Sequence, residues 1–404
     1  MDGTDGSHTT DGMHGMDDSD FEDVLRTTRQ VVRERVVPLE TQIDESDEIP
    51  AGLRELAART GLFGFALPCE YGGFGLSMAR EARLVMELGY TTPAFRSLFG
   101  TNNGIAGHVL MLGGTEAQKK EHLPRMASGE CTASFALTED EAGSDPSGLR
   151  TTARRVPGGW SLTGAKRFIT NAPVADLFMV FARHGENDRP TRDISVFLVP
   201  RGTPGLTVGP RDAKMGQHGA WTAEVLLDAV EVPDTALVGG AAGKGRGYLT
   251  AMACLAHGRL HIAALCVGMA ERLLDETTAY ALARTQSGRP IAEFQLVQGL
   301  IADSQTELYA GRALVLAAAE AYDQGHDTRL GPSCAKYFAS EMVGRVADRA
   351  VQVHGGTGYM RGVAVERFYR DARLFRIYEG TSQVQQVVIA RQALEAARRR
   401  GPVS

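Results

Sequence analysis

A chain of 404 residues is too long for one small hydrophobic core, so two or three domains are expected. Hydrophobic residues make up 43% and charged residues 23% of the sequence, which is typical of a soluble globular protein. The net charge of −6 argues against a general nucleic-acid or membrane-surface binder.

The cysteine pattern indicates a reducing compartment. The five cysteines are scattered, odd in number and form no CxxC pair, so neither a disulfide framework nor a metal site is expected. The N-terminus is acidic and poor in apolar residues, so no signal peptide is expected. No apolar stretch reaches the length that a membrane span needs. The sequence therefore predicts a cytoplasmic protein with no membrane segment.

The first part of the chain has a helical pattern after a tail rich in glycine, aspartate and threonine. From Asp20 onward apolar residues recur at helical spacing, with Ser19 or Asp20 as the expected N-cap. Further on, Thr115 and Gln118 have the spacing of a capping box at the start of another helix. These patterns predict an all-α domain.

The apolar period changes to two at about Cys131 and returns to the helical period after about Val238. Six short β-branched or aromatic runs, separated by turn residues, predict a small β-barrel or sandwich. Four long alanine- and leucine-rich segments then predict a four-helix bundle. The predicted fold is α+β and multidomain, with a disordered tail over 1–18, a helical domain over 19–130, a β domain over 131–238 and the bundle over 239–404.

One carboxylate stands out near the C-terminus. Glu379 lies between an aromatic residue and a Gly-Thr-Ser turn, where Gly380 permits a tight turn and Thr381 or Ser382 can cap the last helix. Apolar neighbours would raise its pKa and the helix N-terminus would lower it, and a general base needs such a balance. The same residues also fit an ordinary helix cap with an acid in its first turn.

Two loops at predicted strand ends have the composition of a binding site. LTEDEAGSD, which begins at Leu137, combines small residues and hydroxyls that can bind a planar heterocycle or an anionic group. KRFITNA places Phe168 two positions before Thr170, so on a strand one can pack on a ring while the other bonds its edge. Plain surface turns would explain either loop equally well.

Two segments between the long helices also suit a ligand. ARTQSGRPIAEFQ contains Arg284, which can pair with a phosphate. QVHGGTGYMRG, which begins at Gln352, is glycine-rich and permits close approach of backbone to a ligand. Each can equally be a turn between helices.

Together and in this order, these motifs resemble the acyl-CoA dehydrogenase family over roughly Phe21 to Leu394. The resemblance implies a flavoprotein with FAD as cofactor that oxidises an acyl-CoA to the trans-2-enoyl-CoA. It also implies an electron-transfer flavoprotein as electron acceptor and a homotetramer, or a homodimer, as the assembly.

The resemblance carries roles to individual positions. Glu379 would be the catalytic base that removes the α-proton while flavin N5 accepts the β-hydride. FAD contacts within the subunit would come from Phe135, Thr138, Ser144, Phe168, Thr170, Thr381 and Gln383. Contacts to the FAD of a neighbouring subunit would come from Arg284, Gln295, Gln352 and Gly356, and substrate contacts from Ser144, Arg259 and Gly380.

One departure from the family pattern leaves the acyl carrier open. Ala256 stands where the family often has an aspartate that helps to handle CoA, so the acyl group can ride on CoA or on an acyl carrier protein. Two other hypotheses are an oxygen-using oxidase or flavin monooxygenase, and a non-catalytic member that binds flavin or a partner. The acid at position 379 argues against the monooxygenase and, together with the net negative charge, against the non-catalytic member.

Overall fold

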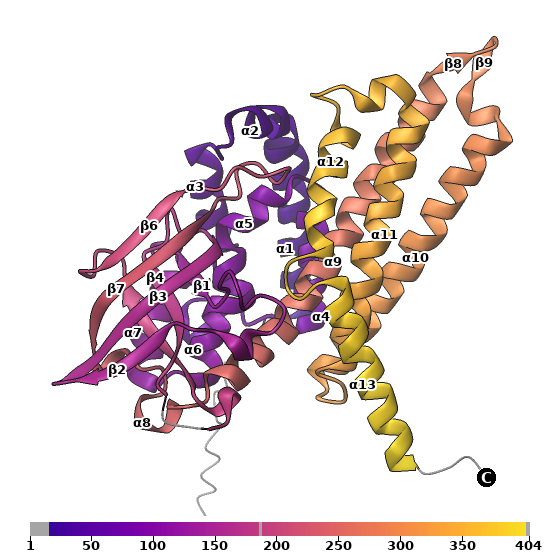
Figure 1. Cartoon of the computed structure of the whole chain (residues 1–404). Helices are drawn as coiled ribbons and strands as arrows, with labels where there is room; N and C mark the ends of the chain where they lie inside the picture. Colours follow the sequence, from indigo (N-terminus) through magenta and orange to yellow (C-terminus); the bar gives the residue numbers. More distant parts are fainter. Residues whose placement is uncertain (1–15, 186–187, 401–404) are drawn as a thin grey trace, which may run out of the picture.

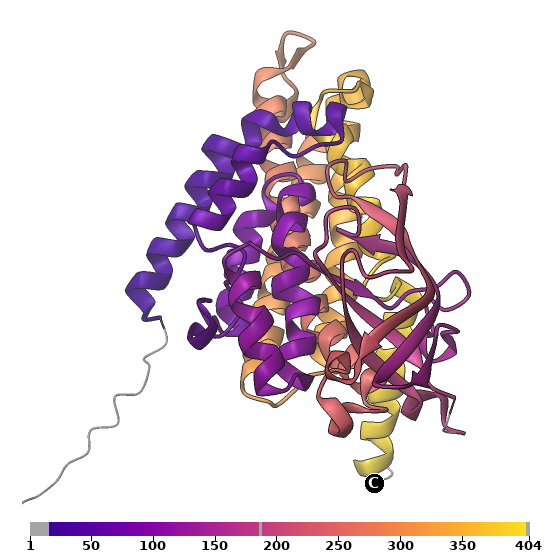
Figure 2. The ribbon, with the colours of Figure 1, turned by 90° about the vertical axis from the view of Figure 1, so that its left-hand side faces the viewer.

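The chain folds in the order α, β, α, and the computed structural model describes residues 16–185 and 188–400 (Figure 1). Most of the predicted tail, residues 1–18, lies outside the described residues, and its last residue, Asp18, already belongs to α1. The β-sheet and the long C-terminal helices lie side by side, and the N-terminal helices pack against both (Figures 1 and 2).

The N-terminal helices begin with an unexpected cap. Asp17 caps α1 through its Oδ1, which accepts from the backbone N–H of Asp20 at 2.8 Å, so the prediction of Ser19 or Asp20 was wrong. The capping box of Thr115 and Gln118 is present at α7. The α-helices of this part are α1 Asp18–Gln30, α2 Glu40–Ser46, α3 Ala51–Arg59, α4 Met78–Gly89, α5 Pro93–Thr101, α6 Gly107–Gly113 and α7 Glu116–Ala127.

The predicted β domain is one curled seven-stranded sheet in the order β1-β4-β2-β3-β7-β6, with β5 also paired to β4. The strands are β1 Ala133–Ala136, β2 Thr152–Val156, β3 Gly159–Thr170, β4 Leu177–Arg183, β5 Ile194–Pro200, β6 Leu206–Arg211 and β7 Thr222–Pro233. Strand β6 was not predicted, because its short sequence LTVGPR contains glycine and proline, which are depleted in strands.

The four predicted long helices are present, and α11 packs against α9, α10 and α13. The helices are α8 Gly240–Gly243, α9 Gly247–Ala283, α10 Gln295–Asp323, α11 Leu330–His354, α12 Ala364–Ala372 and α13 Ser382–Arg400, and the short strands β8 Thr285–Gln286 and β9 Arg289–Pro290 join α9 to α10. Helix α12 was not predicted, although its buried residues Val365, Phe368 and Ala372 recur at helical spacing.

Helix α9 is the central element of the C-terminal part. It is 37 residues long and, within the described part of the chain, is long and apolar enough to cross a membrane, so the prediction that no stretch reaches this length was wrong. Its most apolar window is 83% buried inside the fold, as expected for a core helix. Gly268 of α9 faces Gly89 of α4, and a Cβ at Gly268 would lie 2.0 Å from the carbonyl oxygen of Met86. The two glycines therefore bring α4 and α9 into backbone contact.

Candidate active site

Glu379 lies in the turn between α12 and α13 and has a strained backbone. Its φ is 54° and that of Gly380 is 85°, so two consecutive residues are left-handed. A non-glycine residue in this region costs on the order of 1 kcal/mol and persists only where its surroundings hold it. Gln385 donates from Nε2 to the carbonyl oxygens of Glu379 and Gly380 at 3.0 and 3.1 Å, and Lys336 donates from Nζ to that of Gly380 at 2.7 Å.

Thr381 rather than Ser382 caps α13. The Thr381 Oγ1 accepts from the backbone N–H of Val384 at 3.2 Å, whereas the Ser382 hydroxyl donates to Glu341 at 2.6 Å. The turn is therefore fixed at both ends, and Glu379 lies just before the cap instead of in the first turn of the helix. The alternative reading of Glu379 as a first-turn acid does not match this geometry.

The Glu379 carboxylate faces α9. Its Oε2 is buried and has no hydrogen-bond partner among the described residues. A Cβ built at Gly258 would lie 2.8 Å from that oxygen, so glycine leaves the room that the carboxylate occupies. Burial raises the pKa of Glu379 to about 7, and the charges of Arg96, Arg259 and Lys336 oppose that rise. Desolvation therefore outweighs three cations, and the carboxyl can gain and lose a proton near neutral pH.

Arg259 lies beside this carboxylate, as the sequence predicts. It follows Gly258 on α9, is buried, and donates from Nη1 to the Ser333 hydroxyl at 3.3 Å. Burial lowers the pKa of the Arg259 guanidinium, and the negative charge of Glu379 opposes this effect only in part. Lys336, which sequence reasoning missed, is the second cation here, and burial lowers its pKa to about 8.

The two predicted binding loops of the β domain are neighbours. The backbone N–H of Arg167 donates to the carbonyl oxygen of Thr138 at 2.9 Å, and the Ser134 hydroxyl donates to that of Thr170 at 2.8 Å. Phe168 has a φ of 55° at a register shift between β3 and β7, so the strict alternation used to place Phe168 and Thr170 on one face does not apply. The Phe168 ring is 59% exposed.

A buried ion pair under these loops was missed by sequence reasoning. Glu139 accepts from Lys166 Nζ at 2.7 Å and from the backbone N–H of Thr151 at 3.0 Å. Lys166 is fully buried, and burial lowers its pKa to about 8. Lys166 also donates to the carbonyl oxygen of Leu137 at 3.2 Å, so the pair fixes the first loop to β3.

The other residues predicted to contact FAD in the same subunit differ in burial. Phe135 is half-buried, with its ring 4.7 Å from that of Phe181, whereas Ser144 is exposed. Thr381 at the start of α13 is half-buried and Gln383 is exposed. The exposed Phe168 ring, on a segment whose backbone bonds the neighbouring loop, suits a planar, polar-edged ring system.

Four predicted residues gather elsewhere, at the end of the bundle that carries β8 and β9, away from the α12–α13 turn (Figure 1). All are exposed: Arg284, Gln295, Gln352 and Gly356. Tyr280 links the ends of α9 and α11 by donating to the carbonyl oxygen of His354 at 3.3 Å, and the two rings stack at 4.1 Å. The structure therefore groups these four residues and separates them from Glu379.

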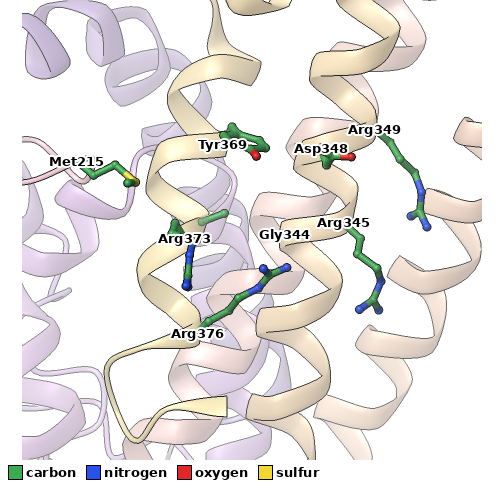
Figure 3. A pocket seen from close by; sticks show the side chains of 9 residues that line it. Met215, Gly344, Arg345, Asp348, Arg349, Tyr369, Arg373 and Arg376 are labelled. Atoms are coloured by element: carbon green, nitrogen blue, oxygen red, sulfur yellow. The ribbon is translucent and has the colours of Figure 1, made fainter. Parts of the chain in front are cut away.

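A basic cavity of about 590 Å³ lies between α11 and α12, near Met215 (Figure 3). Arg345 and Arg349 on its α11 side pair with Glu307 at 3.0 and 3.1 Å. Four arginines and one aspartate give the lining a positive charge: Arg345, Arg349, Arg373, Arg376 and Asp348. Glu379 is not part of this lining, and no sequence motif predicted the cavity.

Family models match nearly all of the chain. The N-terminal, middle and C-terminal domains of acyl-CoA dehydrogenase match residues 18–130, 134–230 and 245–394. The chain belongs to the acyl-CoA dehydrogenase family. It is 37% identical to an acyl-CoA dehydrogenase of Bacillus subtilis, over 91% of this chain and 96% of that one.

Two further comparisons agree with this assignment. The CarC subunit of the caffeyl-CoA reductase–Etf complex of Acetobacterium woodii is 37% identical, over 88% of this chain and 92% of that one. The structure of butyryl-CoA dehydrogenase from Megasphaera elsdenii matches with a TM-score of 0.88 and 32% identity, over 93% of this chain and 98% of that one.

As a member of this family, the chain is an FAD-dependent oxidoreductase that acts on CH–CH bonds of acyl-CoA substrates. Its residues fit the flavin: the exposed Phe168 ring suits the face of the isoalloxazine, and the hydroxyls of Thr138, Ser144 and Thr170 suit its polar edge. The buried, unpartnered Oε2 of Glu379 fits a substrate proton as its missing partner.

Proposed function

We propose that Glu379 is the catalytic base that removes the α-proton of the acyl thioester. The observation that carries this proposal is its carboxylate, which is buried at Oε2, has no hydrogen-bond partner among the described residues and has a pKa raised to about 7. A base is most effective when its pKa is close to the working pH, and the α-proton of a thioester is a poor acid. When bound, FAD supplies the acceptor for the β-hydrogen as hydride.

The surrounding residues hold the base and its substrate in place. Lys336 and Gln385 both donate to the carbonyl oxygen of Gly380 and so keep the carboxylate turned towards α9. Arg259 supplies positive charge that favours the ionised base. Substrate contacts are assigned to Ser144, Arg259 and Gly380, and contacts to FAD in the same subunit to Phe135, Thr138, Ser144, Phe168, Thr170, Thr381 and Gln383.

A second subunit completes the FAD site in this proposal. Arg284, Gln295, Gln352 and Gly356 are exposed at one end of the bundle, away from Glu379. Large apolar side chains are exposed near these positions: Leu282 at 68%, Leu296 at 88% and Tyr359 at 82%. Exposed apolar residues that gather in one region mark interaction surfaces, which supports a homotetramer or homodimer in which this end meets the FAD of a neighbour.

The electron acceptor is proposed to be an electron-transfer flavoprotein. The support is the similarity to CarC, whose name places it in a complex with such a flavoprotein. A cytoplasmic location is part of the same proposal and rests on five scattered cysteines without a pair.

The test of the base is Glu379→Gln, which keeps the side-chain volume but removes the proton acceptor. The holoenzyme should stay folded and yellow, while anaerobic flavin bleaching by butyryl-CoA or octanoyl-CoA slows by about 10²- to 10⁴-fold. Glu395→Gln, which changes an exposed carboxylate on α13, is the matched control and should bleach at the wild-type rate. Bleaching of the Glu379→Gln enzyme at the wild-type rate would place the base elsewhere.

A further inference from the structure

One carboxylate on α11 contacts the chain on both sides of Glu379. The Oε1 of Glu341 accepts from the Ser382 hydroxyl at 2.6 Å, and its Oε2 lies 3.1 Å from Nε of Arg376. Arg376 is three residues before Glu379 and Ser382 is three residues after it. The side chain of Glu341 therefore joins the two ends of the turn that carries the base. These three side chains, Glu341, Arg376 and Ser382, form what we call the Glu341 bridge.

The arginine of this bridge is fitted against α11. Its Nη2 donates to the backbone carbonyl oxygen of Glu341 at 3.3 Å. A Cβ at Gly344, one turn further along α11, would overlap Nη2 of Arg376, so the guanidinium occupies the space that a side chain there would fill (Figure 3). The ion pair is half-buried, with 29% of the Arg376 side chain and 27% of the Glu341 side chain exposed. These contacts keep the chain before the base close to α11.

The serine of the bridge anchors the other end of the turn. Ser382 is buried, and its hydroxyl does not cap α13, because Thr381 does so. A buried hydroxyl needs a hydrogen-bond partner, and Ser382 finds it in the carboxylate of Glu341. A hydrogen bond to a carboxylate is stronger than one between neutral groups. Ser382 therefore fixes the start of α13 to α11.

The turn between these two anchors needs such support. Glu379 and Gly380 are consecutive left-handed residues, and this backbone persists only where its surroundings hold it. Lys336, also on α11, donates to the carbonyl oxygen of Gly380 at 2.7 Å in the middle of the turn. Helix α11 thus contacts the turn at its start, its middle and its end.

The bridge acts on the position of the base more than on its charge. Within the described part of the chain, the cations that lower the pKa of Glu379 are Arg96, Arg259 and Lys336, and Arg376 is not one of them. Removing the bridge should therefore change where the carboxylate lies more than how readily it takes up a proton. Proton transfer requires the base within hydrogen-bond reach of the proton. A misplacement of about 1 Å can lower a rate on the order of 100-fold.

We propose that Glu341 is a positioning residue for the reaction, which joins the two ends of the α12–α13 turn and so keeps the Glu379 carboxylate in place for removal of the α-proton. The inference rests on the proposed role of Glu379 as the base. Glu341 acts through the turn, without contact to the substrate, so its loss should slow the chemical step and leave substrate binding nearly unchanged.

The variant Glu341→Ala, which removes both contacts of the bridge, tests this proposal. Anaerobic flavin reduction is followed with whichever of butyryl-CoA and octanoyl-CoA bleaches the wild-type holoenzyme faster, and rates are expressed per bound FAD. The limiting rate constant should fall about 10- to 100-fold, while the half-saturating thioester concentration changes by less than about threefold. A merely structural role would lower stability without this split between rate and binding.

The matched control is Glu307→Ala on α10. It removes a carboxylate of similar exposure that pairs with two other arginines of α11, Arg345 and Arg349, at 3.0 and 3.1 Å. This control should leave the limiting rate constant and the half-saturating concentration at their wild-type values. An equal loss of rate in Glu307→Ala and Glu341→Ala would overturn the proposal, because any weakening of α11 would then suffice.

Two variants each break one half of the bridge and carry the same test if Glu341→Ala does not retain FAD. Arg376→Met removes the ion pair and Ser382→Ala removes the hydrogen bond, so each should lower the limiting rate constant. The double variant Glu341→Ala/Arg376→Met should be no slower than Glu341→Ala, because the contact is already lost, and effects that multiply would refute the bridge. A wild-type rate in Glu341→Ala beside a slow Glu379→Gln would refute the bridge alone. Wild-type rates in both would refute the proposed function as well.

Discussion

The protonation of Glu379 should be visible in the stability of the protein. Burial raises its pKa from the usual 4.5 to about 7. The folded state therefore holds this proton more tightly than the unfolded chain, and stability from this group is fully present below about pH 4.5 and lost as the pH rises through about 7. The complete loss amounts to about 3 kcal/mol at about 1.36 kcal/mol per pH unit, of which about 2 kcal/mol falls between pH 5.5 and pH 8.5.

Glu379→Gln removes this titratable group. The difference in the free energy of unfolding between variant and wild type should therefore depend on pH. Urea unfolding of wild-type and variant holoenzyme, followed by circular dichroism, is compared at pH 5.5 and pH 8.5. From pH 5.5 to pH 8.5, the free energy of unfolding of the variant should rise by about 2 kcal/mol relative to that of the wild type. The exposed Glu395→Gln serves as the control for the loss of a carboxylate as such. If the difference in the free energy of unfolding between wild type and Glu379→Gln is the same at both pH values, the Glu379 carboxyl is not held in a desolvated site and the reasoning fails.

Two further substitutions test the geometry around the base. Gly258→Ala should lower the rate of flavin reduction on the order of 100-fold, because its Cβ would meet Glu379 Oε2 at 2.8 Å, whereas Gly299→Ala on α10 has no atom within 4 Å and should not. Lys336→Met removes a cation that lowers the pKa of Glu379. The pH profile of kcat/KM should therefore move to higher pH, and an unmoved profile would exclude Lys336 from the electrostatics of the base.

Periodicity was sufficient to predict most of the fold, since it reports which face of an element is buried. The long helices and six strands follow from apolar spacing alone. Strand β6 was missed because its sequence contains glycine and proline, which are depleted in strands. Helix α12 was missed although its buried residues Val365, Phe368 and Ala372 recur at helical spacing, because a nine-residue segment shows too few repeats of the pattern. The cap of α1 was missed because several acidic residues in a row all suit a helix N-terminus.

The candidate site could be predicted only where a single segment carries its signal. Glu379 was found because the strained turn, the glycine and the cap are adjacent in sequence. Its electrostatic partners come from α5, α9 and α11 and meet only in the folded chain. Nothing in the local sequence marks Arg96, Gly258 or Lys336, since an arginine, a glycine and a lysine on helices are common on solvated faces.

Arg96 and Glu379, which contact α9 at His261 and Gly258, also act on each other. The positive charge of Arg96 is the foremost of the three that lower the pKa of Glu379 against the effect of burial. The contact of α4 with α9 through Gly89 and Gly268 supports this placement of Arg96, because Glu81 of α4 accepts from His261 and His261 accepts from Arg96.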